Sequence, residues 1–146
     1  MMLPVTLTIA AAAGLGNLIL AYRIVRVRLK DQILLGDGGD PALVARTRAQ
    51  ANFVEYAPFV LILMALIEAA GGDPDRLWGA GGLFVVSRIV HAIGMDRPTA
   101  NPWRAGGALL TWAVLLALSI WGLALAWTGA SSPPVRAIPV EAVPTA

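Results

Sequence analysis

Four long apolar stretches constrain this chain more than any other feature of its sequence. They run from about Leu3 to Val27, Ala51 to Ala70, Leu77 to Met95 and Trp103 to Trp127. A helix of about 20 residues crosses a hydrocarbon core about 30 Å thick. In lipid only helices and closed barrels satisfy every backbone polar group, and the stretches show no strand-like alternation. We therefore expect an all-α fold, an integral membrane four-helix bundle formed by residues 1–128.

Composition supports lipid as the solvent for most of the surface. Hydrophobic residues make up 58% of the chain and charged residues 14%, whereas an ordinary soluble domain is about 45–50% apolar. The chain has no cysteine and one histidine, which excludes disulfides, thiolate metal sites and multi-histidine metal sites. We expect no metal and no nucleic-acid partner. Residues 129–146 carry four prolines without apolar periodicity, which predicts a disordered tail.

The distribution of basic residues predicts the orientation in the membrane. Nine of the eleven lysines and arginines fall in or beside the first and third connections, whereas Arg76 and Arg136 fall on the other side. Cytoplasmic loops carry the excess of positive charge. The first and third connections should thus be cytoplasmic and both termini periplasmic.

The segment RAQANFVEYAP, residues 48–58, carries the densest set of polar groups. Arg48, Asn52, Glu55 and Tyr56 share one face of a helix at 100° per residue. Glu55 lies about 10 Å along the helix from Arg48 and so enters the membrane. One interpretation is a structural ion pair between Glu55 and either Arg88 or Arg48; the other is a binding site.

Other polar and small residues have simpler interpretations. Glu68 should be solvated at the membrane interface, and His91 should be a hydrogen-bonded interior group. Gly14, Gly16 and the run Gly79–Gly82 suit close helix packing.

The segment RAQANFVEYAP resembles the signature of the MAPEG family, the membrane-associated proteins in eicosanoid and glutathione metabolism. The likeness covers nearly the whole chain before the tail and favours the bacterial branch. It extends to SRIVHAIGMDRP near the end of the third helix and to WRAGGALLTW at the start of the fourth. The resemblance implies a homotrimer in the bacterial inner membrane, with glutathione as co-substrate bound between neighbouring protomers near the cytoplasmic face.

The resemblance also implies roles for individual residues. The positions that match glutathione-binding residues are Arg28, Arg48, Gln50, Asn52, Glu55 and Tyr56, with Gln50 reaching from the neighbouring subunit. Arg26 competes with Arg28 for the position at the end of helix one. Arg104 matches the family's catalytic arginine, which stabilises the glutathione thiolate. A cation within about 4–6 Å of a thiol lowers its pKa by about 1–3 units.

These features predict a glutathione transferase or peroxidase that acts on lipophilic electrophiles delivered by the bilayer. Ile89 and Ile93 stand where eicosanoid-forming members carry tyrosines, which argues against eicosanoid synthesis and leaves the acceptor open. One alternative is a non-catalytic membrane scaffold protein whose charged cluster is a structural ion network. A small transporter is less favoured, because the chain shows no discontinuous helix pair or inverted repeat.

Overall fold

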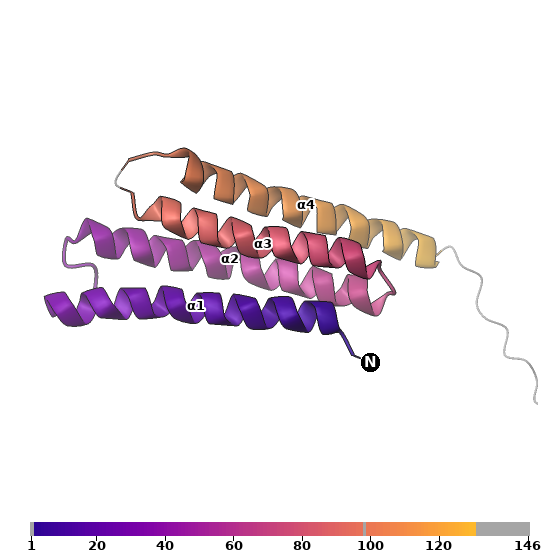
Figure 1. The fold of residues 1–146 in the computed structure, drawn as a ribbon, viewed down its shortest axis with the longest axis horizontal. Coiled ribbons are helices and arrows are strands. Elements are labelled where there is room, and N and C mark those ends of the chain that lie inside the picture. Colours follow the sequence, from indigo (N-terminus) through magenta and orange to yellow (C-terminus); the bar gives the residue numbers. More distant parts are fainter. Residues whose placement is uncertain (1, 98, 131–146) are drawn as a thin grey trace, which may run out of the picture.

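The computed structural model describes residues 2–97 and 99–130, and these residues form four α-helices (Figure 1). The helices are α1 (Pro4–Asp31), α2 (Pro41–Ala69), α3 (Pro74–Met95) and α4 (Pro102–Ala130). All four are long and apolar enough to cross a membrane. The predicted four-helix architecture is therefore confirmed, whereas residues 131–146 of the predicted tail lie outside the described residues.

Local sequence signals determine where each helix begins. A proline stands at the first position of every helix, where its missing N–H costs nothing and its fixed φ suits the helix. Asp40 and Asp73 precede α2 and α3, and their carboxylates accept the amides of Ala42 and Arg76 at 2.8 and 2.9 Å. Before α2 the chain turns through Gly36, Gly38 and Gly39, all with positive φ.

The helices run up and down, so the N-terminus and the end of α4 lie at the same end of the bundle (Figure 1). α1 packs on α2 and α3, and α4 packs on α2 and α3; α1 and α4 are not in contact within the described chain. Phe84, Met64 and Leu118 are among the most deeply buried side chains of the shared core. Gly81 confirms its predicted packing role, because a Cβ there would lie 2.8 Å from Ile9 Cδ1. For Gly14, Gly79 and Gly82 the prediction is wrong within this protomer, because a Cβ at any of them would meet nothing within 4 Å.

Most of the apolar surface of the helices faces outward. Only 17% of the most apolar window of α4 is buried within the protomer, and 28% in α1 and in α2. Large side chains such as Leu123, Phe59 and Leu18 are more than 60% exposed. An apolar exterior of this kind is stable in a bilayer and aggregates in water.

Glu68 has a structural role that the sequence analysis did not predict. Its carboxylate accepts the amides of Val5 at 3.0 Å and Thr6 at 2.8 Å. These amides belong to the first turn of α1, where N–H groups have no partner within the helix and favour a negative charge. Glu68 is partly exposed at the end of α2, as expected, and through it α2 also caps α1.

Candidate functional site

The end of the bundle that holds the first and third connections contains a pocket lined by three arginines. Arg48 from α2, Arg97 from the loop after α3 and Arg104 from α4 all line it, and its volume is about 550 Å³. Two of these residues, Arg48 and Arg104, were singled out from segments far apart in the sequence. The fold brings them to one cavity, which we call the arginine pocket.

The three guanidinium groups have no anionic partner within the described chain. The ion pair found among the described residues joins Arg23 and Asp96 instead. Asp37 also lines the pocket, but its carboxylate accepts the amide of Gly39 at 3.0 Å. Several exposed cations around one acidic group make the pocket attractive for an anion with more than one negative group.

Arg97 is the pocket residue that sequence reasoning missed, having been counted only as a charge for topology. Its guanidinium carbon lies 5.6 Å from the centre of the Trp103 ring, within the range of a cation–π contact. The available signal was its place beside the end of helix three, seven residues before Arg104. The contact with Trp103 holds Arg97 beside the start of α4.

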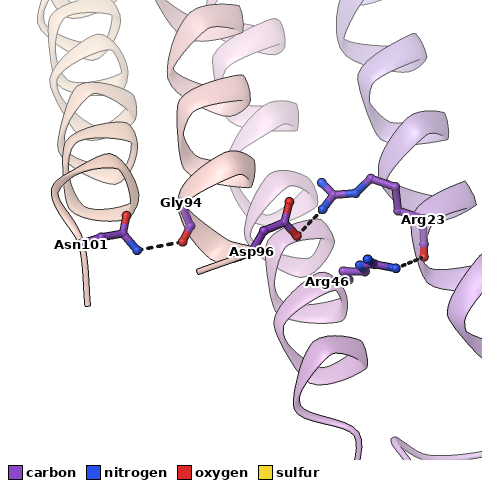
Figure 2. Close-up of polar contacts among 5 residues, drawn as sticks. All are labelled: Arg23, Arg46, Gly94, Asp96 and Asn101. Carbon is purple, nitrogen blue, oxygen red and sulfur yellow. Dashed lines mark hydrogen bonds and ion pairs between the residues drawn. The ribbon is translucent and has the colours of Figure 1, made fainter. Parts of the chain in front are cut away.

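Close packing between α3 and α4 positions the first turn of α4 and hence the backbone of Arg104. His91 Nδ1 lies 3.0 Å from the Arg104 carbonyl oxygen, and because a carbonyl only accepts, Nδ1 carries the hydrogen. Asn101 donates to the Gly94 carbonyl at 2.9 Å (Figure 2) and accepts the Arg104 amide at 3.0 Å. His91 is therefore a hydrogen-bonded interior group, as predicted.

A network of hydrogen bonds connects Asn52 to the interior. Arg88 donates from Nη2 to Asn52 Oδ1 at 2.7 Å and from Nη1 to Thr111 Oγ1 at 3.1 Å. Thr111 in turn lies 2.9 Å from the Ser87 hydroxyl. The network links α2, α3 and α4, and it fixes the Asn52 amide with its oxygen inward, so that the NH₂ group remains available as a donor.

Glu55 and Tyr56 lie farther along the same face of α2, away from the arginine pocket. Glu55 is exposed and Tyr56 half-buried. Glu55 is close enough to Arg88 to act on it through space, but it forms no ion pair within the described chain. The interpretation of Arg88 or Arg48 as the ion-pair partner of Glu55 is therefore wrong for this protomer.

Gln50 and Arg28 are not in the arginine pocket of their own protomer. Gln50 points to α1, where its amide donates to Asn17 Oδ1 at 3.3 Å. Arg28 donates to the Ile33 carbonyl at 3.3 Å, just beyond the end of α1. The placement of Gln50 on another side of α2 agrees with the angle of about 200° from Arg48.

Two further arginines connect the helices at this end of the bundle, as Figure 2 shows. Arg23 of α1 forms the ion pair with Asp96, at the end of α3. Arg46 of α2 donates to the Arg23 carbonyl at 3.2 Å. These contacts fix the ends of α1, α2 and α3 relative to one another, beside the arginine pocket.

Comparison with known proteins agrees with the resemblance noted in the sequence. The sequence model of the MAPEG family matches residues 6–124, which is most of the chain. Two curated relatives, the inner membrane protein YecN of Escherichia coli strain K12 and of strain O6:H1, are each 29% identical over 103 residues. The aligned region covers 70% of this chain and 78% of each relative.

Proposed function

Because the chain belongs to the MAPEG family, we propose that it is a glutathione-dependent membrane enzyme of the bacterial inner membrane. It conjugates the glutathione thiolate to lipophilic electrophiles or uses glutathione to reduce lipid hydroperoxides. The observation that carries the proposal is the arginine pocket, where Arg48 and Arg104 meet without an anionic partner in the described chain. The inner-membrane assignment follows from the YecN relatives, which are inner membrane proteins.

The charges of glutathione complement the polar groups of α2 and the arginine pocket. Glutathione has two carboxylates, one ammonium and one thiol. Arginines suit the carboxylates through charge-assisted bonds, and Glu55 suits the ammonium. An extended tripeptide spans about 10 Å, which is also about the distance along α2 from Arg48 to Glu55. One molecule can therefore reach both residues.

Arg104 is proposed to activate the thiol. A thiol with a pKa near 8.5 is only a few per cent thiolate at neutral pH. A guanidinium within about 4–6 Å lowers that pKa by about 1–3 units, so no general base is needed. The thiolate attacks carbon, the C–S bond forms, and the leaving group departs with its electron pair.

The proposal includes a homotrimer, and the exposed Glu55 supports it. An unpaired carboxylate at depth in a bilayer costs about 2.5–3.5 kcal/mol on insertion scales. A neighbouring protomer that covers Glu55 and holds glutathione against it removes much of that cost. The neighbour would also supply Gln50, which lies outside the arginine pocket of its own chain.

The alternative of a non-catalytic scaffold has less support. It required Arg48 and Glu55 to act as a structural ion network, and the described chain contains no such pair. Free cations around a pocket stabilise a fold poorly, because they repel one another and satisfy no partner. They suit a ligand that brings its own negative charge.

Calorimetry in detergent tests the proposed glutathione site. We expect Arg48→Ala to weaken glutathione binding at least tenfold, since charge-assisted bonds contribute about 1.5–3 kcal/mol. Arg76→Ala, which removes an exposed arginine at the other end of α3, is the matched control and should bind as the wild type does. Wild-type binding no tighter than that of an isomeric tripeptide would refute the site.

A further inference from the structure

Arg97 is the cation of the arginine pocket to which the proposed function gives no task. Arg48 is proposed to bind a carboxylate of glutathione, and Arg104 to stabilise its thiolate. Arg97 lines the same pocket, is exposed, and forms no ion pair within the described chain. The carboxylate next to it in the sequence, that of Asp96, is paired with Arg23 instead (Figure 2). The guanidinium of Arg97 is therefore available to a negative group that a ligand brings.

Two contacts hold Arg97 at the edge of the pocket, although it lies in a loop. Its amide donates to the Gly94 carbonyl near the end of α3, at 3.3 Å. Its guanidinium carbon lies 5.6 Å from the centre of the Trp103 ring, in the first turn of α4. A guanidinium that lies over an aromatic face can still form bonds through the N–H groups at its edge. Arg97 is thus oriented before a ligand arrives, which lowers the entropic cost of binding.

Glutathione brings two carboxylates, and the structure changes which arginine is placed for the second one. The family resemblance implied Arg28 as a glutathione-binding residue. Arg28 instead donates to the Ile33 and Leu34 carbonyls, at 3.3 and 3.5 Å, beyond the end of α1. Arg97 lines the arginine pocket, whereas Arg28 does not. Within one protomer, Arg97 is therefore the better placed of the two arginines.

The direction of the bound peptide decides which carboxylate reaches Arg97. The ammonium and the α-carboxylate of glutathione share one carbon atom, so both lie near Glu55 when Glu55 binds the ammonium. Glu55 lies about 10 Å farther along α2 than Arg48, toward the middle of the membrane. Arg97 lies at the opposite side of Arg48, in the third connection just beyond Met95. The glycyl carboxylate, at the other end of the peptide, is therefore the one that reaches Arg48 and Arg97.

We propose that Arg97, held by the Trp103 ring, binds the glycyl carboxylate of glutathione and makes the site selective for peptides with a free carboxylate at that end. This inference rests on the proposed function, because it assigns a residue within the glutathione site. A guanidinium forms charge-assisted bonds to a carboxylate and only weaker ones to a neutral amide. Arg48 contributes to the same end of the site, so Arg97 accounts for part of the selectivity.

Calorimetry of the full-length protein in detergent with two peptides tests the role of Arg97. The peptides are glutathione and its glycinamide analogue, in which a neutral amide replaces the glycyl carboxylate. We expect the wild type to bind glutathione about tenfold or more tightly than the analogue. Arg97→Gln should reduce this preference about threefold or more, because Arg48 remains and an exposed pair contributes less than a buried one. Arg76→Gln, at an exposed position at the other end of the bundle, should keep the wild-type preference.

Variants of Trp103 test whether the ring positions Arg97. Trp103→Leu leaves the charge of Arg97 in place but removes the aromatic face, so we expect the preference for glutathione over the analogue to fall about two- to fivefold. Trp103→Phe keeps an aromatic face and should retain most of the preference. Trp78→Leu is the matched control, because Trp78 lies at the other end of the bundle and is 44% exposed, against 48% for Trp103. The ratio of two affinities is insensitive to a general loss of stability, which weakens both peptides alike.

Equal affinity of the wild type for the two peptides would overturn the inference and leave the glutathione site itself in place. An unchanged preference in Arg97→Gln would also overturn it, and loss of the preference in Arg28→Gln alone would assign the glycyl carboxylate to Arg28. An unchanged preference in Trp103→Leu would overturn the positioning role of the ring. Absence of glutathione binding by the wild type would refute the proposed function itself, so the two failures are distinguishable.

Discussion

At the level of single residues, unmatched positive charge distinguishes the arginines of the proposed site from those that join helices. Arg23 and Arg46 have partners in the protein and fix helix ends. Arg48 and Arg104 have none within the described chain and line a cavity open to water. Arg88 lies between these cases, because two neutral groups orient it and none neutralises it.

Thr111 should be important for stability, because its hydroxyl joins Arg88, Ser87 and the Gly107 carbonyl, the last at 2.8 Å. We expect Thr111→Val to lower the free energy of unfolding by about 1–3 kcal/mol, since it leaves buried donors unsatisfied. Thr111→Ser keeps the hydroxyl and should lose less. Thermal unfolding in detergent measures both, and equal losses would show that packing, not the network, matters.

Sequence reasoning located Arg48 and Arg104 but gave Arg88 the wrong partner. Helical periodicity places residues on a face of one helix, yet it does not say which facing residue comes within hydrogen-bond distance. That depends on the rotation of α3 against α2, which Asn52 and Phe53 help to determine. Arg97 was missed for a related reason: it lies in a loop, where no periodicity applies.

At the level of helices, the number and order of the elements were predictable from hydropathy. Hydropathy did not mark the start of α2, because Arg46, Arg48 and Gln50 interrupt Pro41–Gln50 and the apolar stretch begins at Ala51, but Pro41 after the glycine–aspartate turn did predict it. The proline and the Asp40 cap, rather than hydropathy, mark that start. This early start matters for the site, because it makes Arg48 part of a rigid helix.

The contact between α3 and α4 depends on glycines. A Cβ at Gly107 would lie 2.6–2.8 Å from the backbone and Cβ of His91, whereas a Cβ at Gly106 would meet nothing within 4 Å. We expect Gly107→Ala to displace α4, lower the unfolding temperature and raise the pKa of the bound glutathione thiol through Arg104. Gly106→Ala should change none of these three properties. Equal behaviour of the two variants would contradict the packing described here.

For the whole molecule, the positive-inside rule makes a prediction about topology. The chain contains no cysteine, so Leu35→Cys and Met2→Cys each introduce a unique thiol at a position more than 80% exposed. We expect an impermeant thiol reagent to label Met2→Cys from the periplasm and Leu35→Cys only after the membrane is opened. Labelling of both from the same side would refute a four-span topology.

The assembly state can be measured by native mass spectrometry of the purified protein. We expect the mass of three chains, because Glu55 is exposed and the predicted partner Gln50 lies outside the arginine pocket of its own protomer. A chain that remains monomeric while it binds glutathione normally would contradict the trimeric site. The glutathione site itself would then have to be complete within one protomer.

The central claim is that the arginine pocket binds glutathione and holds its thiol as a thiolate. Thiolate absorbs in the ultraviolet, so a pH titration of the difference spectrum of bound glutathione measures its pKa directly. We expect a midpoint about 1–3 pH units below that of the free thiol, and a return toward about 8.5 in Arg104→Ala with the peptide still bound. The same midpoint in the wild type and in Arg104→Ala would contradict the account.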